Sequence, residues 1–226
     1  MHLLINYFTP SNLQRYSEFI TCIHENLGNK LIKQIIVFVS DNSEFHFTHE
    51  KLKVIKVDGR PTYKDYFDYC NKNLKGEICI IANTDIFFDE SLEVLDKTIM
   101  TNVFVALSRH EITKKGENFE IIPFNNPYSQ DTWIFKAPIK VSKNMNFPLG
   151  FHGCDNKIAK IMFDLGYGIR NPLYQILTAH FHISEYRKRQ VLLPPPFLGI
   201  EPTDDINKTS SVIQVKGFDV LGQPIL

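Results

Sequence analysis

Apolar residues in the first half of the chain follow two patterns that alternate along the sequence. Short continuous apolar runs predict strands buried on both faces, and apolar residues that recur every three to four positions predict amphipathic helices. The strand runs cover residues 2–7, 35–39, 54–57 and 78–82, and the helical runs cover 11–28 and 63–74. Such alternation is typical of an α/β fold with a mostly parallel central sheet flanked by helices.

The second half of the chain is less regular but contains elements of the same kinds. We expect strands over 103–107, 132–135 and 176–183, and a helix over 154–165 that Gly166 ends. Three consecutive prolines at 194–196 mark a change in composition. We therefore predict one domain over residues 1–190 and an extended, proline-rich C-terminal arm over 191–226.

Composition limits the class of protein and its partners. The chain has 226 residues, of which 43% are hydrophobic, and this suffices for one domain with a buried core. Lys and Arg total 25, as do Asp and Glu, so the basic excess typical of nucleic-acid binding is missing and no nucleic-acid partner is expected. No apolar run approaches the ~20 residues of a membrane helix. We expect a cytoplasmic protein with four reduced cysteines and no membrane span.

The end of the fourth predicted strand carries the first candidate chemistry. Asn83 and Asp85 follow the apolar run directly and are separated by one residue. Ligands of open α/β sheets bind at the carboxyl ends of strands, and oxygen ligands suit Mg²⁺ or Mn²⁺ beside a diphosphate. An alternative of equal weight is an Asx turn, with Asp89 capping a helix that starts near Ser91.

Asn83-Thr84-Asp85 resembles the D-x-D element of glycosyltransferases with the GT-A fold. This resemblance implies a single GT-A-like, Rossmann-like domain in which Asp85 and Asn83 hold Mn²⁺ or Mg²⁺ against the diphosphate of a nucleotide-sugar. Asn83 stands where the family has Asp, so one negative charge is missing.

A second match lies upstream, where the turn that carries Asp41 resembles the V-D-D-G-S turn of the same enzymes. The resemblance implies that Asp41 accepts a hydrogen bond from the nucleotide base and that Phe8 and Thr9 line the base. Arg60 and Tyr63 stand where the family contacts nucleotide and phosphate, and an arginine there supplies two donors to anionic oxygens. Asp41 as a plain turn residue and Arg60 as a solvated side chain are the alternatives.

A third match is the segment 150–156, G-F-H-G-C-D-N, which resembles the G-x-G-G-E-D-D stretch of inverting GT-A enzymes. The resemblance implies that Asp155 is the general base that takes the proton of the acceptor hydroxyl. Cys154 replaces the family's Glu. Asp155 as a simple helix cap is the alternative, and Asp131, beside the only tryptophan, Trp133, is a rival base.

A fourth match is the pair His180 and His182, which a strand would place on one face. Many GT-A enzymes bring a late histidine to the metal, and neutral imidazole suits Mn²⁺. Either histidine could instead be a hydrogen-bonded core residue.

Together the four matches predict a glycosyltransferase that moves a sugar from a UDP- or GDP-sugar donor to a glycan or other hydroxyl acceptor, with inversion. A nucleotidyltransferase is the nearest alternative, but the segment 7–10 contains no glycine where that class has a glycine-rich phosphate loop. A sugar- or nucleotide-binding module without catalysis is the alternative from another class.

Overall fold

A seven-stranded mixed sheet forms the centre of the protein, seen here in a computed structural model that describes residues 1–40, 43–115, 118–184, 192–219 and 223–226. The strands lie in the order β10-β6-β9-β4-β1-β2-β3. Only β9 runs antiparallel to its neighbours, β4 and β6. The bounds are β1 His2–Tyr7, β2 Gln34–Val39, β3 Leu52–Lys56, β4 Ile78–Ala82, β6 Val103–Leu107, β9 Thr132–Lys136 and β10 Gly168–Arg170. The predicted α/β class is confirmed.

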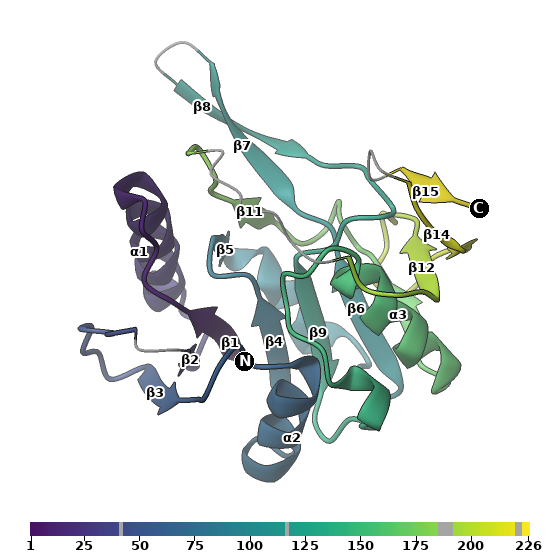
Figure 1. Cartoon of the computed structure of the whole chain (residues 1–226), viewed down its shortest axis with the longest axis horizontal. Helices are drawn as coiled ribbons and strands as arrows, with labels where there is room; N and C mark the ends of the chain where they lie inside the picture. The colour runs from purple at the N-terminus through teal and green to yellow at the C-terminus, as the bar shows by residue number, and fades with distance from the viewer. Residues whose placement is uncertain (41–42, 116–117, 185–191, 220–222) are drawn as a thin grey trace.

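Different helices cover the two faces of this sheet (Figure 1). Because strand side chains alternate in direction, Leu3 and Ile5 of β1 pack with α1 (Leu13–Gly28), whereas Leu4 packs with α2 (Tyr63–Asn73) and α3 (Cys154–Asp164). The short helix η1 (Glu90–Lys97) joins the α1 side. The three predicted helices are confirmed, each to within about two residues at either end.

Two helix starts show why the chain folds this way locally. Asn12 caps α1 by accepting the N–H of Arg15, at 2.9 Å. Thr62 and Asp65 form a reciprocal capping box at the start of α2. The caps place the first turns of both helices at the carboxyl edge of the sheet, where the strands that precede them end.

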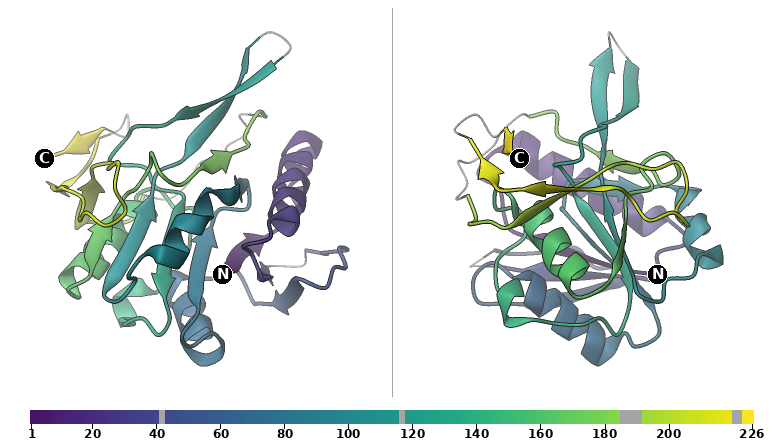
Figure 2. Two further views of the ribbon diagram at one scale, coloured as in Figure 1. Left: turned by 180° about the vertical axis from the view of Figure 1, so that it is seen from behind. Right: turned by 90° about the vertical axis from the view of Figure 1, so that its right-hand side faces the viewer.

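A smaller four-stranded sheet lies beyond this carboxyl edge, in the order β5-β11-β7-β8. Its strands are β5 Ile86–Phe88, β7 His110–Lys115, β8 Asn118–Pro123 and β11 Thr178–His180. The β7–β8 hairpin projects from the body of the domain (Figure 2). The predicted strand at 176–183 is shorter than expected, because β11 ends at His180 and the chain then turns away along α1 through Ser184, which bonds Glu18.

The segment after the prolines differs from the expected arm, because it packs into the domain. The strands β12 (Phe197–Ile200) and β13 (Val212–Val215) pair with each other, and Leu198 and Ile200 are fully buried in the α3 side of the core. Asn156 of α3 donates a hydrogen bond to the Leu198 carbonyl at 3.0 Å. A last pair, β14 (Gly217–Phe218) and β15 (Pro224–Ile225), follows.

Across the described part of the chain, no helix is long and apolar enough to cross a membrane. All four cysteines are free and buried, as small core residues.

The packing of β12 predicts that the C-terminal segment contributes to stability. Leu198→Ala should lower the free energy of unfolding by ~2–5 kcal/mol, because the removed methyl groups leave a cavity beside α3. Leu226→Ala is the matched control, since that side chain is 63% exposed. Urea denaturation measures both variants, and an unchanged midpoint for Leu198→Ala would show that the segment is a dispensable arm.

Candidate functional site

The carboxyl ends of β1 and β4 open into a cleft of about 1020 Å³. The cleft is bounded by the start of α1, the turn after β4, the loop before β9, the start of α3 and the β14–β15 pair. Ligands of α/β sheets bind at this edge because the sheet's connections leave a crevice there. The predicted site residues that line the cleft are Phe8, Arg60, Asn83, Thr84, Asp85, Asp155, His180 and His182.

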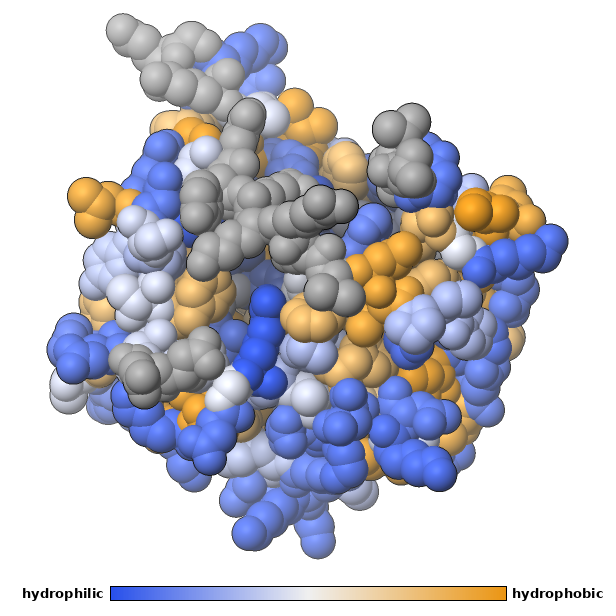
Figure 3. Space-filling view, viewed as in Figure 1, coloured by the Kyte–Doolittle hydropathy of each residue, from blue (hydrophilic) through white to orange (hydrophobic). Residues whose placement is uncertain are grey.

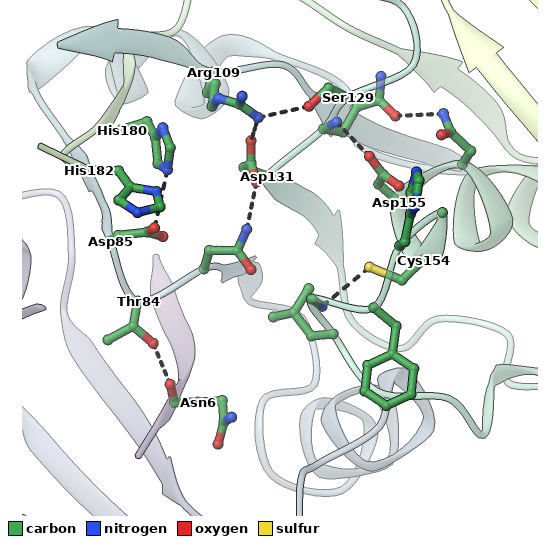
Figure 4. A pocket seen from close by; sticks show the side chains of 18 of the residues that line it. Asn6, Thr84, Asp85, Arg109, Ser129, Asp131, Cys154, Asp155, His180 and His182 are labelled. Carbon is green, nitrogen blue, oxygen red and sulfur yellow. Dashed lines mark hydrogen bonds and ion pairs between the residues drawn. The ribbon is translucent and has the colours of Figure 1, made fainter. Parts of the chain in front are cut away.

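On one side of the cleft, three side chains could hold a metal ion (Figure 4). Asp85, His180 and His182 each offer a ligand atom, and these atoms lie within 4.8 Å of one another. The turn after β4 carries Asp85, while β11 delivers His180 beside it, because Phe181 donates its backbone N–H to the Asp85 carbonyl at 2.9 Å. The expected histidine pair and the carboxylate are thus in one place.

The Asp85 carboxylate is buried and compensated by two cations. Its Oδ2 accepts from His180 Nε2 at 3.1 Å and from the Arg15 guanidinium at 2.5 Å. Burial disfavours the charged carboxylate, but His180 and Arg15 outweigh it and hold the pKa of Asp85 well below its usual range. Asp85 is therefore an anion at any physiological pH.

His180 lies between two carboxylates, since its Nδ1 also donates to Glu111 at 2.7 Å. Burial alone would favour the neutral ring, but Asp85 and Glu111 raise the pKa of His180 to about 9. The ring carries its proton at pH 7 in this arrangement, so a cation that binds it must displace that proton.

The donor set suits a divalent cation of the Mn²⁺ type. A carboxylate is a hard oxygen ligand that suits Mn²⁺, and imidazole is a borderline ligand for first-row divalent ions. Burial lowers the pKa of His182, which keeps its ring neutral and able to ligate. His182 Nε2 is buried and has no hydrogen-bond partner among the residues that the structure describes, so this nitrogen is available to a cation. The Asn83 amide nitrogen is engaged on the other side, because Nδ2 donates to Asp131 at 2.6 Å.

Asp131 lies between the two sides of the cleft and has both oxygens occupied. Oδ1 accepts from Asn83, and Oδ2 accepts from Arg109 at 2.6 Å. Arg109 also donates to Ser129 and Glu111, at 2.7 and 2.6 Å. This network makes Asp131 a structural anion that ties the turn after β4 to the loop before β9.

Asp155 stands on the other side of the cleft, in the first turn of α3 (Figure 4). Gly153 begins this helix in the left-handed conformation, at φ 79°, where its missing Cβ also avoids the Phe197 ring. The N-cap of α3 is Gly153, so no side chain fills that position, and the Asp155 carboxylate accepts the backbone N–H of Gln130 at 3.1 Å. Burial raises the pKa of Asp155 to about 7, against the effect of that hydrogen bond.

Two predicted nucleotide contacts, Tyr63 and Thr9, lie outside the lining of the cleft. The Tyr63 ring is fully buried in the core and packs edge-on against Trp133, with ring centroids 5.1 Å apart, so it is a core residue. Thr9 is exposed and binds Ser43 Oγ through its backbone, outside the lining of the cleft. Asp41 lies outside the described residues. Asp89 caps η1, as the alternative interpretation of the segment after β4 expects.

Several lining residues had no signal in the sequence. Arg15 reaches the cleft from the first turn of α1, and a lone arginine on a helix gives no pattern. Asn6 lies next to the last residue of β1, among apolar residues, and its buried Oδ1 has no hydrogen-bond partner in the described part of the chain. Arg109 follows an apolar strand, and its contact with Asp131 joins residues that are remote in the sequence.

The wall nearest Asp155 is rich in rings. It combines Phe151 and His152 of the loop before α3 with Tyr128 and with Phe218 of β14. The His152 and Phe218 rings lie 5.5 Å apart. On the face drawn in Figure 3, hydrophobic side chains gather on the side of the C-terminal strands. Such a wall fits the apolar face of a sugar ring.

No protein-family model matches the chain, and no curated protein matches its sequence. A solved structure that shares the architecture is a mannosyltransferase from Pyrobaculum calidifontis in complex with GDP-Man and Mn²⁺, with a TM-score of 0.52 and 12% identity. The match covers 80% of this chain and 56% of that one. At this identity the likeness shows the fold alone, and the fold is α/β of the GT-A type.

Two other solved structures match less well. The 4-diphosphocytidyl-2C-methyl-D-erythritol synthase from Anaerococcus prevotii matches with a TM-score of 0.41 and 13% identity, over 83% of this chain and 91% of that one. TarS from S. aureus in complex with UDP-GlcNAc matches with a TM-score of 0.37 and 12% identity, over 60% and 44%.

The position of His182 beside Asp85 and His180 predicts that Mn²⁺ binding depends on the His182 ring. His182→Ala should weaken Mn²⁺ binding by roughly 10-fold or more, because one ligand is lost, and should not disturb the fold, because Nε2 bonds nothing. Titration followed by the electron paramagnetic resonance of free Mn²⁺ measures the affinity. His24→Ala, at an exposed position of α1, is the control. Equal affinities for the two variants would place the metal elsewhere.

The raised pKa of Asp155 predicts a pH-dependent stability. A carboxyl whose folded pKa lies above its ordinary value of 3.8 destabilises the fold as pH rises toward about 7. Asp155→Asn removes this charge and should melt at a higher temperature than wild type at pH 8, with the difference shrinking toward pH 4. Melting curves over this pH range test it, and a constant difference would mean that burial does not penalise the Asp155 anion.

Proposed function

We propose that this protein is a glycosyltransferase that transfers a sugar from a UDP- or GDP-sugar to an acceptor hydroxyl, with inversion and with help from Mn²⁺ or Mg²⁺. The observation that carries the proposal is the division of one cleft into two sides. A set of cation ligands lies at the end of β4, and a carboxylate with a pKa near 7 lies at the start of α3.

The β4 side suits the donor. A nucleotide held over the carboxyl ends of β1 and β4 would meet Phe8 as a flat apolar surface and the unpartnered Asn6 oxygen as an acceptor. A diphosphate would then lie near Asp85, His180 and His182, which would hold the divalent cation. A cation so placed supplies charge neutralisation for the leaving diphosphate.

The α3 side suits the acceptor. Asp155 is the better base of the two candidates, because Asp131 has both oxygens engaged by Asn83 and Arg109. The Asp155 carboxylate accepts the backbone N–H of Gln130 and is partly exposed. The surrounding rings, Phe151 and Phe218, would hold an acceptor sugar by its apolar face.

We assign to these residues a single displacement at the anomeric carbon. The Asp155 carboxylate takes the proton of the acceptor hydroxyl as that oxygen attacks the anomeric carbon. The new C–O bond forms on the face opposite the breaking bond to the diphosphate, and the nucleoside diphosphate leaves. Inversion follows because no covalent sugar–protein bond forms.

Replacing Asp155 should distinguish the binding of the nucleotide-sugar from the transfer of the sugar. Asp155→Asn keeps the shape of the side chain and should retain the affinity for nucleotide-sugar, while transfer falls by ~10²–10⁴-fold. Wild-type transfer should rise as pH increases through about 7, the range in which Asp155 loses its proton. Thermal shift with UDP- and GDP-sugars plus Mn²⁺ identifies the donor, and nucleotide release with an acceptor glycan measures transfer.

Asp131→Asn is the matched control, since it makes the same replacement of a carboxylate by an amide at a neighbouring position. Loss of transfer in this variant with full activity in Asp155→Asn would reverse the base assignment. Stabilisation by nucleotide-sugars without any turnover would instead support a binding module, and consumption of a nucleoside triphosphate with a sugar phosphate would support a nucleotidyltransferase.

A further inference from the structure

The Arg15 guanidinium occupies the place beside Asp85 where the proposed divalent cation would bind. Its guanidinium lies in the cleft with 14% of the side chain exposed and donates through one terminal nitrogen to Asp85 Oδ2 at 2.5 Å. The same oxygen also accepts from His180. An incoming divalent ion and the Arg15 guanidinium therefore compete for one carboxylate.

The other end of the guanidinium is anchored. Its second terminal nitrogen donates to Glu18 at 2.8 Å, and its plane lies 4.7 Å from the centre of the Phe19 ring. Glu18 is itself buried and accepts from the backbone N–H and hydroxyl of Ser184, at 2.5 and 3.1 Å. One contact of Arg15 is thus fixed by the fold, while the contact to Asp85 faces the cleft and can be exchanged.

We propose that Arg15 is a diphosphate-binding residue that changes partner: it neutralises Asp85 in the free protein and pairs with the phosphate oxygens when a cation and a diphosphate enter. The anchor on Glu18 keeps the guanidinium within the cleft during the exchange. A planar guanidinium suits this task because its donors match two anionic oxygens at once.

The exchange keeps the charge of the site balanced in both states. Without ligand, Asp85 is paired with Arg15 and His180, and no carboxylate is left bare. With ligand, the cation takes the place of Arg15 at Asp85, and the freed guanidinium meets a second anion that arrives with that cation. Cation and diphosphate should accordingly bind more tightly together than separately.

Arg15→Gln tests the exchange with two probes that need no sugar transfer. Mn²⁺ alone should bind about fivefold tighter than to wild type, since one partly buried ion pair no longer competes. Inorganic diphosphate in saturating Mn²⁺ should bind roughly 10- to 100-fold more weakly, as expected for the loss of a charged hydrogen-bond donor. Calorimetry measures both, and Arg15→Lys, which keeps the charge, should recover part of the diphosphate affinity.

Lys64→Gln is the control, since it removes an equal charge from an ion pair with Asp68 on α2, outside the cleft. Unchanged diphosphate affinity in Arg15→Gln would overturn the proposal and leave Arg15 as a structural partner of Asp85. Weaker Mn²⁺ binding in that variant would also overturn it, because Arg15 would then support the cation site.

This inference rests on the proposed function for the nature of the donor, but the probes keep the two apart. Wild type that binds Mn²⁺ and diphosphate through Arg15, yet never transfers a sugar, would retain the inference and reject the glycosyltransferase. If wild type transfers a sugar while Arg15→Gln binds diphosphate normally, the glycosyltransferase is retained and the role of Arg15 is rejected.

Discussion

The ion pairs of the Asp85 carboxylate join three parts of the chain that are distant in sequence. Arg15 comes from α1, His180 comes from β11, and Asp85 itself ends the turn after β4. A buried carboxylate that lost these partners would cost several kcal/mol. The small sheet at the carboxyl edge must therefore bring β11 against β5, and α1 must start where its first turn reaches the cleft. The same constraint that holds the fold together assembles the candidate cation site.

The elements of the central sheet and the three helices are readable from sequence because each has a strong local pattern. The runs at β1, β4 and β6 are continuous and apolar, and the ends of α1 and α3 are marked by glycine. The β7–β8 hairpin carries no such mark, since the described residues of β8 are exposed and alternate weakly. The packing of the C-terminal strands has no local pattern, because their burial depends on docking against α3, which four-residue strands do not reveal.

The residues of the candidate site also differ in whether the sequence reveals them. Asp85 follows a predicted strand, the two histidines lie on one face of another, and Asp155 opens a predicted helix, so their places along the chain point to one cleft. Arg15 could not be found in this way, because an isolated helical arginine has no motif. Tyr63 illustrates the opposite error: it stands at a promising position in the sequence, but the rings around it form a core that takes its side chain away from the cleft.

The most direct test of this account is a crystal structure with Mn²⁺ and a UDP- or GDP-sugar, with anomalous data collected at the manganese edge. We expect one strong anomalous peak within bonding distance of Asp85 and at least one of His180 and His182, in contact with the donor diphosphate, and the donor sugar facing Asp155. A peak elsewhere, or a nucleotide bound away from the carboxyl ends of β1 and β4, would contradict the account.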